Sequence, residues 1–421
     1  MSNIQFDSKR TRIFSILFVL LVSLAGWASA QRVDYDQREK TASPEVKARI
    51  AEMRTRIQQR NASFTVGYTT AADIPIKDLT GLVVPQDRTV RIQRQNARAK
   101  LFLQADEKLR LDYEKKIGQP AHDSILTPSP YLPFFDWRTR GIITTVQNQK
   151  SCGSCWDFGA LAAYESSFKK RNGISLNLSE QHILDCSKSG SCVGGWYGTV
   201  FDYLMSNGTV GEDKYSPYIA QSNPSCALPN GVKTFQVVAW GYVTSETLPG
   251  TNVVRMPTVS EIKNALVENG PLAAGIWVTH DFAHYTGGVL EETHPPGSIV
   301  DGLTVQPDGS LMGPYYGEII YAENHVILII GWNDAKQAWL IKNSWGQGWG
   351  ETGGFGNDRG YGWIKYYADS VGIDSGWVKS VSNTWSLLKP DINVVPRTID
   401  PVIKPKPTEI KPRQVIIKPT N

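Results

Sequence analysis

The cysteines of this chain place the strongest constraint on its fold and its chemistry. There are five, and all of them lie between Cys152 and Cys226. In a compartment that favours disulfides, five cysteines can form two bridges and leave one thiol over. A free thiol in such a compartment needs a structural or chemical reason.

The N-terminus predicts export. Basic residues at 9–12 precede an apolar run over residues 13–26, and residues 28–30 supply an Ala-Ser-Ala cleavage pattern. The run is too short to cross a bilayer as a helix of about 20 residues. We therefore predict that residues 1–30 are a secretory signal peptide, with an uncleaved membrane anchor as the alternative. No later stretch is apolar enough for a span, so the exported remainder is expected to have no stable membrane span.

Composition and charge narrow the class of protein. Hydrophobic residues make up 41% of the 421 residues and charged residues 20%, as in a globular chain rather than a disordered or collagenous one. The net charge is +4, from 44 basic and 40 acidic residues. This balance gives no reason to expect nucleic acid as a partner.

A charged region precedes the cysteines. Residues 31–130 contain no cysteine and few aromatic residues, and helical periodicity predicts helices over residues 44–57 and 88–116. Prolines between residues 120 and 133 then favour a linker.

The region of residues 131–382 predicts a large α+β unit. Its predicted helices cover residues 155–171, 179–184, 198–205 and 260–268. Its predicted strands cover residues 235–243, 272–278, 326–332 and 339–343. Residues 383–421 are rich in proline and lysine, which predicts an extended tail, either disordered or used for binding.

Two cysteines lie three residues apart, at Cys152 and Cys155. This spacing suits a redox dithiol or half of a zinc site. A zinc site needs a second pair at matching spacing, and Cys186, Cys192 and Cys226 do not supply one. A dithiol oxidoreductase needs a small βαβ domain around the pair, which this segment lacks.

A third interpretation makes one cysteine a nucleophile. Cys155 stands at the expected start of a helix, where the helix dipole favours a thiolate. A nucleophilic cysteine needs a base and a group that orients the base. His325 enters a buried strand, and Asn343 can accept a hydrogen bond from one imidazole nitrogen. Trp345 and Trp349 follow closely and can shield that bond from water.

Three blocks of sequence together resemble the papain family of cysteine peptidases. They are residues 149–156, Asn324-His325 and residues 343–350, in the family's order. Smaller matches occur at residues 136–138, 178–181, 185–186 and 192–195. The resemblance covers roughly residues 132–378, and three ordered blocks are a specific signal where one would be weak.

The resemblance implies a role for each catalytic residue. Cys155 corresponds to the nucleophile and His325 to its partner in a thiolate–imidazolium pair. Asn343 corresponds to the residue that orients the imidazole. The Gln149 amide and the backbone N–H of Cys155 correspond to the oxyanion hole. The implied reaction is hydrolysis of a peptide bond through a thioester acyl-enzyme, with no metal and no cofactor.

The resemblance also implies where a peptide binds. The main chain of Gly194 and Gly195 would bind the peptide backbone by strand-like hydrogen bonds. We assign further contacts with substrate to Trp196, Tyr197, Gly275, Asn324, Val326 and Trp345. The pocket among Trp196, Tyr197, Gly275 and Val326 is expected to prefer an apolar or aromatic side chain.

The implied fold is α+β and two-lobed, with a helical lobe carrying Cys155 and a β-barrel-like lobe carrying His325. The family pattern pairs Cys152 with Cys192 and Cys186 with Cys226, which leaves Cys155 free. Family members carry a helical propeptide that lies through the cleft in reverse. We therefore expect residues 31–130 to be an inhibitory propeptide of the peptidase domain, residues 131–382; a permanent N-terminal domain is the alternative.

The sequence departs from the family pattern in three places. Asp157 replaces a small residue, typically alanine, and either tunes the ion pair or is an ordinary surface residue of the helix. Gly159 stands where serine or a similar small residue is usual. The stretch of residues 288–323 is longer than usual and is expected either to narrow the cleft, to contact the propeptide or to form a surface excursion.

We therefore predict an exported cysteine peptidase made as a zymogen, secreted or extracytoplasmic: periplasmic, lysosomal or extracellular according to the organism. Its partners are peptide or protein substrates and its own propeptide. The alternatives are a catalytically silent relative used for binding, and a transpeptidase or amidase whose acyl-enzyme meets an amine.

Overall fold

The computed structural model describes residues 35–211, 217–223, 225–226, 234–315 and 318–384. The predicted signal peptide and almost all of the predicted tail lie outside the described residues. Within the described ranges, no helix has both the length and the apolar character needed to cross a membrane.

A mostly antiparallel sheet forms the centre of the described chain. Its strand order is β5-β16-β6-β13-β14-β15-β8, and β2 pairs with β13 outside this path. Only β15 and β8 among these pairs run parallel. The strands are β2 (Phe134–Asp136), β5 (Val237–Tyr242), β6 (Leu272–Ile276), β8 (Val289–Leu290), β13 (His325–Asn333), β14 (Ala338–Lys342), β15 (Tyr361–Lys365) and β16 (Ile373–Ser380).

Strand β13 is covered on both faces, as its sequence requires. It reads as a nearly unbroken apolar run after His325, and every residue except Asn333 is buried. Such a run fits a strand with packed elements on both sides rather than one with a solvent face. Because β13 is central and rigid, it places His325 at a fixed point of the fold.

Helix α5 (Cys155–Asn172) packs against β13 and β16. Its last turn carries Lys169 and Arg171, and Gly173 follows at φ +71°, a left-handed cap that glycine adopts without steric cost. The other helices of this part are α6 (Glu180–Cys186), α7 (Tyr197–Ser206), α8 (Val259–Asn269), α9 (His280–Ala283) and the short 3₁₀ turns η2 (Trp137–Arg140) and η4 (Ala368–Ser370).

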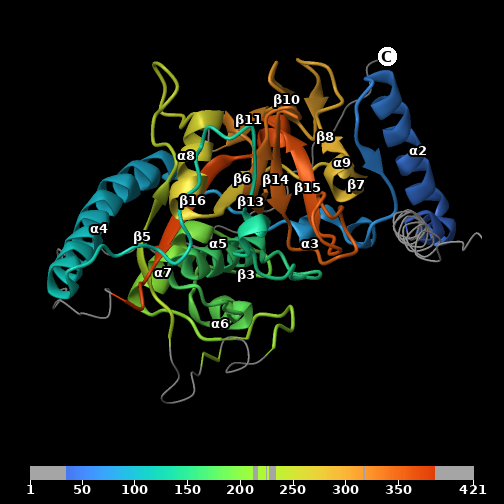
Figure 1. Cartoon of the computed structure of the whole chain (residues 1–421). Helices are drawn as coiled ribbons and strands as arrows, with labels where there is room; N and C mark the ends of the chain where they lie inside the picture. Colours follow the sequence, from blue (N-terminus) through green and yellow to red (C-terminus); the bar gives the residue numbers. More distant parts are fainter. Residues whose placement is uncertain (1–34, 212–216, 224, 227–233, 316–317, 385–421) are drawn as a thin grey trace, which may run out of the picture. The chain divides into compact units, whose positions relative to one another are not determined.

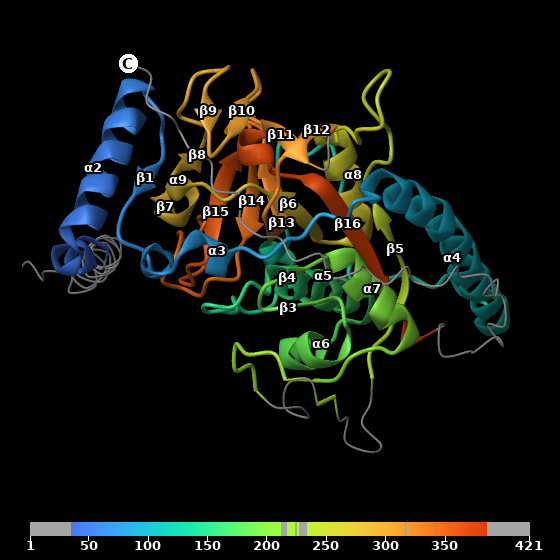
Figure 2. The ribbon, with the colours of Figure 1, turned by 180° about the vertical axis from the view of Figure 1, so that it is seen from behind.

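The region that precedes the central unit is folded onto it. It contains α2 (Pro44–Gln59), β1 (Thr65–Val66), η1 (Thr70–Asp73), α3 (Ile76–Leu79) and α4 (Arg88–Ile117). Strand β1 pairs with β7 (Tyr285–Gly287), and α4 packs against β5 (Figure 1). Seen from behind, the chain between α3 and α4 runs past β4 (Gly194–Gly195), close to α5 (Figure 2).

The two helices predicted for this leading region are confirmed. The Ser43 side chain caps α2, Pro44 occupies its first turn, and Ile50, Met53 and Ile57 form its buried face. Helix α4 begins at Arg88 as predicted and ends one residue later than the predicted boundary. The predicted helices and strands of the later region are also present, with small shifts at their ends.

The long stretch of residues 288–323 forms a sheet of its own. Its strands are β9 (Ile299–Val300), β10 (Leu303–Val305), β11 (Leu311–Tyr315) and β12 (Glu318–Tyr321), in the order β12-β11-β10-β9. A small cluster of Leu303, Val305, Leu311 and Ala322 forms its core. The Tyr315 hydroxyl donates to the carbonyl oxygen of Val84, so this sheet contacts the leading region.

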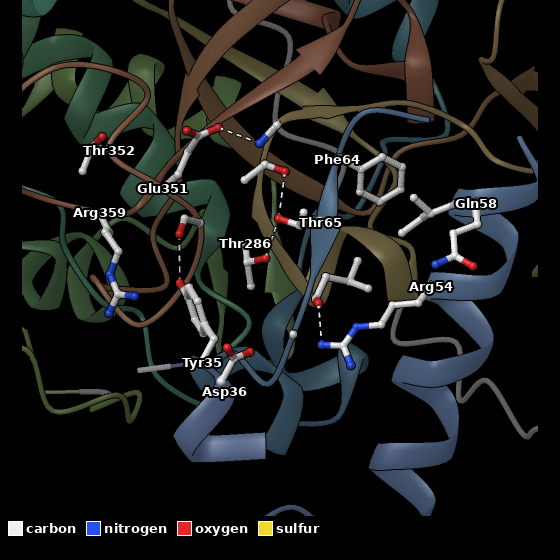
Figure 3. A pocket seen from close by; sticks show the side chains of 16 residues that line it. Tyr35, Asp36, Arg54, Gln58, Phe64, Thr65, Thr286, Glu351, Thr352 and Arg359 are labelled. Atoms are coloured by element: carbon white, nitrogen blue, oxygen red, sulfur yellow. Dashed lines mark hydrogen bonds between the residues drawn. The ribbon is translucent and has the colours of Figure 1, made fainter. Parts of the chain in front are cut away.

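A hollow of about 860 Å³ marks the seam between α2 and the strand pair β1–β7 (Figure 3). Tyr35 Oη donates to the carbonyl oxygen of Gly350 over 2.9 Å at its edge, and Arg54 donates to the carbonyl oxygen of Val66. Its lining includes no cysteine and no histidine. The seam therefore joins the leading region to the central unit away from the residues expected to carry the chemistry.

A buried ion pair holds α4 against α5. Arg171 Nη2 lies 2.8 and 2.5 Å from the two carboxylate oxygens of Asp106. Each side chain is only 2% exposed. Removing one member of such a pair leaves an uncompensated charge in the interior.

We expect Asp106→Ala to lower the free energy of unfolding of the full chain by about 3–5 kcal/mol, because the buried Arg171 loses the carboxylate to which it is hydrogen-bonded. The matched control is Asp112→Ala on the same helix, whose pair with Lys108 is solvent-exposed. Chemical denaturation measures both variants. Equal effects of the two substitutions would contradict the importance of the buried pair.

Candidate active site

Cys155 is the first residue of α5, and its thiol is free and fully buried. The other four cysteines form the disulfides Cys152–Cys192 and Cys186–Cys226, which is the pairing that the resemblance implies.

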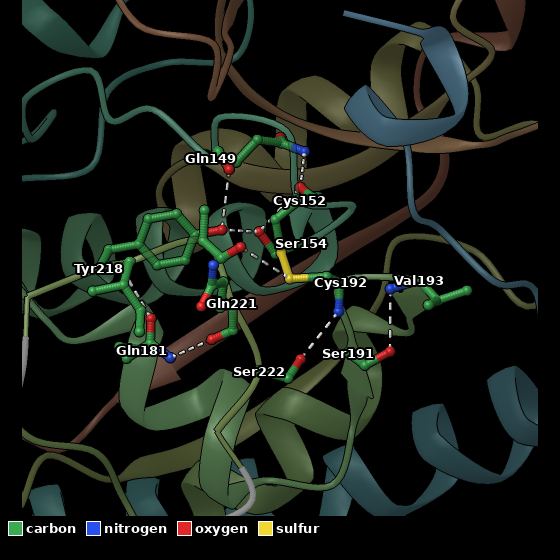
Figure 4. The surroundings of a disulfide bond; sticks show 12 residues. Gln149, Cys152, Ser154, Gln181, Ser191, Cys192, Val193, Tyr218, Gln221 and Ser222 are labelled. Atoms are coloured by element: carbon green, nitrogen blue, oxygen red, sulfur yellow. Dashed lines mark hydrogen bonds between the residues drawn. A yellow bond between two sulfur atoms is a disulfide. The ribbon is translucent and has the colours of Figure 1, made fainter.

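The Cys152–Cys192 disulfide brings two distant segments together (Figure 4). The backbone N–H of Gly153 donates to the carbonyl oxygen of Cys192 over 2.9 Å. Cys192 stands just before β4, which contains Gly194 and Gly195. The covalent bridge therefore fixes the two glycines beside the start of α5.

The imidazole of His325 is held in one orientation. Its Nε2 lies 2.9 Å from Oδ1 of Asn343, so Nε2–H donates and the tautomer is set. The Trp345 ring lies 4.9 Å from the imidazole between centroids and covers it. Nδ1 of His325 has no hydrogen-bond partner among the described residues, which leaves it available to take a proton.

Packing of α5 on β13 brings Cys155 and His325 to the same place. The backbone N–H of Val326, the residue after His325, points to the Cys155 thiol. Gly159, one turn after Cys155, lies against Val326: a Cβ added at Gly159 would stand 2.4 Å from Cγ1 of that valine. The departure at Gly159 thus permits the close approach of helix and strand.

The amide of Gln149 points to the same spot. Its Oε1 accepts from Ser344 Oγ over 2.6 Å, which fixes the direction of the amide. Its Nε2 donates to the carbonyl oxygens of Cys152 and Leu79, each over 2.9 Å. The second of these acceptors is a peptide carbonyl from the leading region.

Residues 79–84, here called the crossing segment, lie directly over Cys155. The backbone N–H groups of Gly81 and Leu82 donate to the carbonyl oxygen of Asn324 over 3.1 and 2.9 Å. Gly195 donates to Gly81 and accepts from Val83, and Leu82 and Gly195 pair in parallel. Strand β4, whose two glycines were expected to bind a peptide, therefore binds this segment through Gly195.

Gly81 must be a glycine for this contact. A Cβ at Gly81 would lie 1.8 Å from the carbonyl oxygen of Gly153, far inside van der Waals contact. Backbone thus meets backbone beside Cys155.

Burial under the crossing segment changes the acid–base state of both groups. It raises the pKa of the Cys155 thiol to about 12, although backbone N–H groups of Val326 and Gly81 act in the opposite direction. It lowers the pKa of His325 to about 4, against the hydrogen bond with Asn343. Near neutral pH both groups are uncharged here, whereas the resemblance implies a thiolate–imidazolium pair. The difference arises because burial removes the water that would stabilise both charges.

The residues predicted to bind substrate gather around the crossing segment, with one exception. Asn324 binds it directly, and Gly275 pairs with Val326 in the β6–β13 register. Trp196 and Tyr197 are buried at the start of α7. Trp345 instead packs on the imidazole.

Two acidic residues of the site were missed by the sequence reasoning. Glu323 and Asp374 are fully buried beside Gly275 and Tyr197. An acidic residue two positions before a long apolar strand was a usable signal for Glu323. Nothing local marks Asp374, since it lies far along the chain on β16.

Asp157 is completely buried, so its interpretation as an ordinary surface residue is wrong. Neither carboxylate oxygen has a hydrogen-bond partner within the described residues. Burial, reinforced by Glu180 and Asp185, raises the pKa of Asp157 well above its usual range. Burial therefore favours the neutral form of this side chain, which lies two residues after Cys155.

Comparison with known proteins agrees with this geometry. A family model described as papain family cysteine protease matches residues 132–305 and 312–375, more than half of the chain. The chain belongs to the papain family. The α+β fold class predicted from the resemblance is thereby confirmed.

Relatives in the family are moderately similar. Ananain from Ananas comosus is 34% identical over 221 residues, which cover 52% of this chain and 53% of ananain. Mouse cathepsin S is 30% identical over 230 residues, covering 52% and 56%. The chain spans about half the length of most of these relatives, but 84% of macrodontain-1 from Ananas macrodontes, at 34% identity.

Two solved structures share the fold, including that of the leading region. Digestive procathepsin L 3 from the Tenebrio molitor larval midgut has a TM-score of 0.54 at 22% identity, over 83% of this chain and 99% of that one. A recombinant stem bromelain precursor has a TM-score of 0.52 at 23% identity, over 85% and 98%.

We expect Gly81→Ala to lift the crossing segment from Gly153, because overpacking of this kind costs about 1–3 kcal/mol. Alkylation of Cys155 by iodoacetamide in the unprocessed chain should become about fivefold faster or more, as measured by mass spectrometry. The control is Gly287→Ala in β7, where an added Cβ meets nothing closer than 3.6 Å. An unchanged rate in Gly81→Ala would contradict the tight contact.

We expect the stability gained by Asp157→Asn to grow with pH. Burial raises the pKa of Asp157 in the folded chain above its unfolded value of about 3.9. The protonated side chain therefore contributes fully to the stability of the wild type below about pH 3.9, and this contribution is lost as the pH rises above that value. Asparagine does not titrate, so the difference in unfolding midpoint between variant and wild type should widen from pH 4 to pH 7. The exposed Asp358→Asn is the control, and a pH-independent difference for Asp157→Asn would refute the assignment.

Proposed function

We propose that this chain is an extracytoplasmic cysteine peptidase made as a zymogen. Cys155 is the nucleophile, His325 its proton acceptor, Asn343 the residue that orients the imidazole, and Gln149 a donor to the oxyanion. The observation that carries the proposal is that a peptide of the chain's own lies over Cys155 with a carbonyl oxygen on the Gln149 amide.

The zymogen form is supported by the direction of the crossing segment. Leu82 and Gly195 pair in parallel, the reverse orientation expected of a family propeptide. A segment held in reverse presents its carbonyl groups to Cys155 in the wrong sense for cleavage. Residues 31–130 are accordingly the propeptide and residues 131–382 the peptidase domain.

Removal of the propeptide returns water to the site and reverses the pKa shifts that burial causes. The Cys155 proton then passes to Nδ1 of His325, and Asn343 holds the ring through Nε2. The thiolate attacks the peptide carbonyl carbon, and the negative oxygen is stabilised by the Gln149 amide and the Cys155 N–H.

The imidazolium then gives its proton to the leaving amine, and the thioester remains on Cys155. A water molecule, deprotonated by His325, attacks the thioester carbonyl carbon. The acid product leaves, and the thiol is restored.

Export is part of the proposal. It is supported by the predicted signal peptide at residues 1–30 and by the two disulfides, which persist in oxidising compartments. The tail, residues 383–421, is proposed as an appendage that catalysis does not need.

The proposal is tested with a fluorogenic peptide after acid-induced processing in mild reductant. We expect Cys155→Ala to abolish turnover and Gln149→Ala to lower kcat by about 100-fold to 1,000-fold, because one oxyanion donor is lost. Gln147→Ala is the matched control, since its amide binds Asn177 at the surface. Turnover that persists in Cys155→Ala would overturn the proposal.

A further inference from the structure

Two buried carboxylates lie beside the crossing segment. The side chains of Glu323 and Asp374 are both 0% exposed. Glu323 directly precedes Asn324, whose carbonyl oxygen binds the N–H groups of Gly81 and Leu82. Asp374 accepts a hydrogen bond at its backbone oxygen from the Tyr197 hydroxyl.

The carboxylate of Glu323 occupies the space above Gly275. A Cβ added at Gly275 would stand 2.0 Å from Oε2 of Glu323, so only a glycine leaves room for the carboxylate there. Gly275 and Tyr197 are two of the residues predicted to form an apolar pocket. That pocket therefore has two carboxyl groups at its closed end, which the expectation of an apolar or aromatic side chain did not include.

The two carboxyl groups at the closed end of the pocket already bind a cationic side chain of the chain itself. Arg88, the first residue of α4, donates from Nε and Nη2 to the two carboxylate oxygens of Asp374. Its guanidinium also lies 3.8 Å from Glu323, and its side chain is 5% exposed. A planar guanidinium that binds a carboxylate with two parallel hydrogen bonds is the strongest geometry for such a pair.

Arg88 makes no hydrogen bond to Glu323. The carboxyl group of Glu323 lies against that of Asp374, and burial together with this neighbour raises the pKa of Glu323 well above its usual range. When the propeptide departs, Asp374 loses its cation. A buried carboxylate without a partner is costly, so Asp374 in the emptied pocket favours a new cation.

The position of the pocket identifies which substrate residue enters it. Gly81 lies on Gly153 beside the nucleophile, and Leu82, one residue further, pairs with Gly195. The Leu82 side chain belongs to the same buried cluster as Tyr197 and Val326. A substrate residue in this place is the second before the scissile bond.

We propose that Glu323 and Asp374 make this peptidase select substrates with arginine, and less strongly lysine, at the second residue before the scissile bond, and that Arg88 fills the same pocket in the zymogen. The aliphatic stem of such a residue packs on Tyr197 and Val326 while its charged end reaches the carboxylates. This inference rests on the proposed function, because it concerns the substrate of that same site.

The test compares two fluorogenic peptides that differ only at that residue, arginine or leucine, on the processed enzyme. We expect kcat/KM to be about 10-fold higher or more for the arginine peptide. Asp374→Asn should lower this ratio about 10-fold or more, through a lower kcat/KM for the arginine peptide. Glu323→Gln should lower the ratio in the same direction, and the exposed Glu268→Gln should not.

Asp374→Asn alone would leave the buried Arg88 of the unprocessed chain without the Asp374 carboxylate. The substitution is therefore made together with Arg88→Met. The matched control is Arg88→Met alone, which yields a processed enzyme of wild-type sequence. If the double variant does not fold, the wild-type ratio decides by itself. Equal or better turnover of the leucine peptide would overturn the inference and leave the proposed function intact, whereas no turnover of either peptide by processed wild type would overturn both.

Discussion

The crossing segment meets the rest of the chain through backbone hydrogen bonds at a place where only glycines allow backbones to touch. Gly81 lies on Gly153, and Leu82 runs beside Gly195. These contacts exclude water from Cys155 and His325, and the loss of water sets the charge state of both groups. The chemistry of the site in this state therefore depends on the fit of one short peptide.

That fit depends in turn on parts of the fold that lie apart in sequence. The Cys152–Cys192 disulfide fixes the glycine strand beside α5. The packing of Gly159 on Val326 fixes α5 against β13. Each of these links tolerates little change, because a covalent bridge and a glycine contact have no flexible side chain to absorb a shift.

Buried ion pairs link the leading region to the central unit at two points along α4. Arg88 binds Asp374 at the start of the helix, and Asp106 binds Arg171 near its middle. Both contacts pair one charge from the leading region with one from the central unit. Departure of the leading region therefore leaves Asp374 and Arg171 without these partners, and at Asp374 we connect that consequence to substrate choice.

The sequence by itself determined the helices of the leading region, because caps and apolar spacing act over a few residues. It also singled out Cys155, His325 and Asn343 as the candidate catalytic set, because they lie in three blocks that follow the order of the papain family. Tertiary structure alone decided three other properties. These are the burial of Asp157, the closure of the site by residues 79–84, and the meeting of Glu323, Asp374 and Arg88. Each of these properties depends on which distant segments pack against a side chain and exclude water from it. The residues next to that side chain in the sequence do not determine this packing.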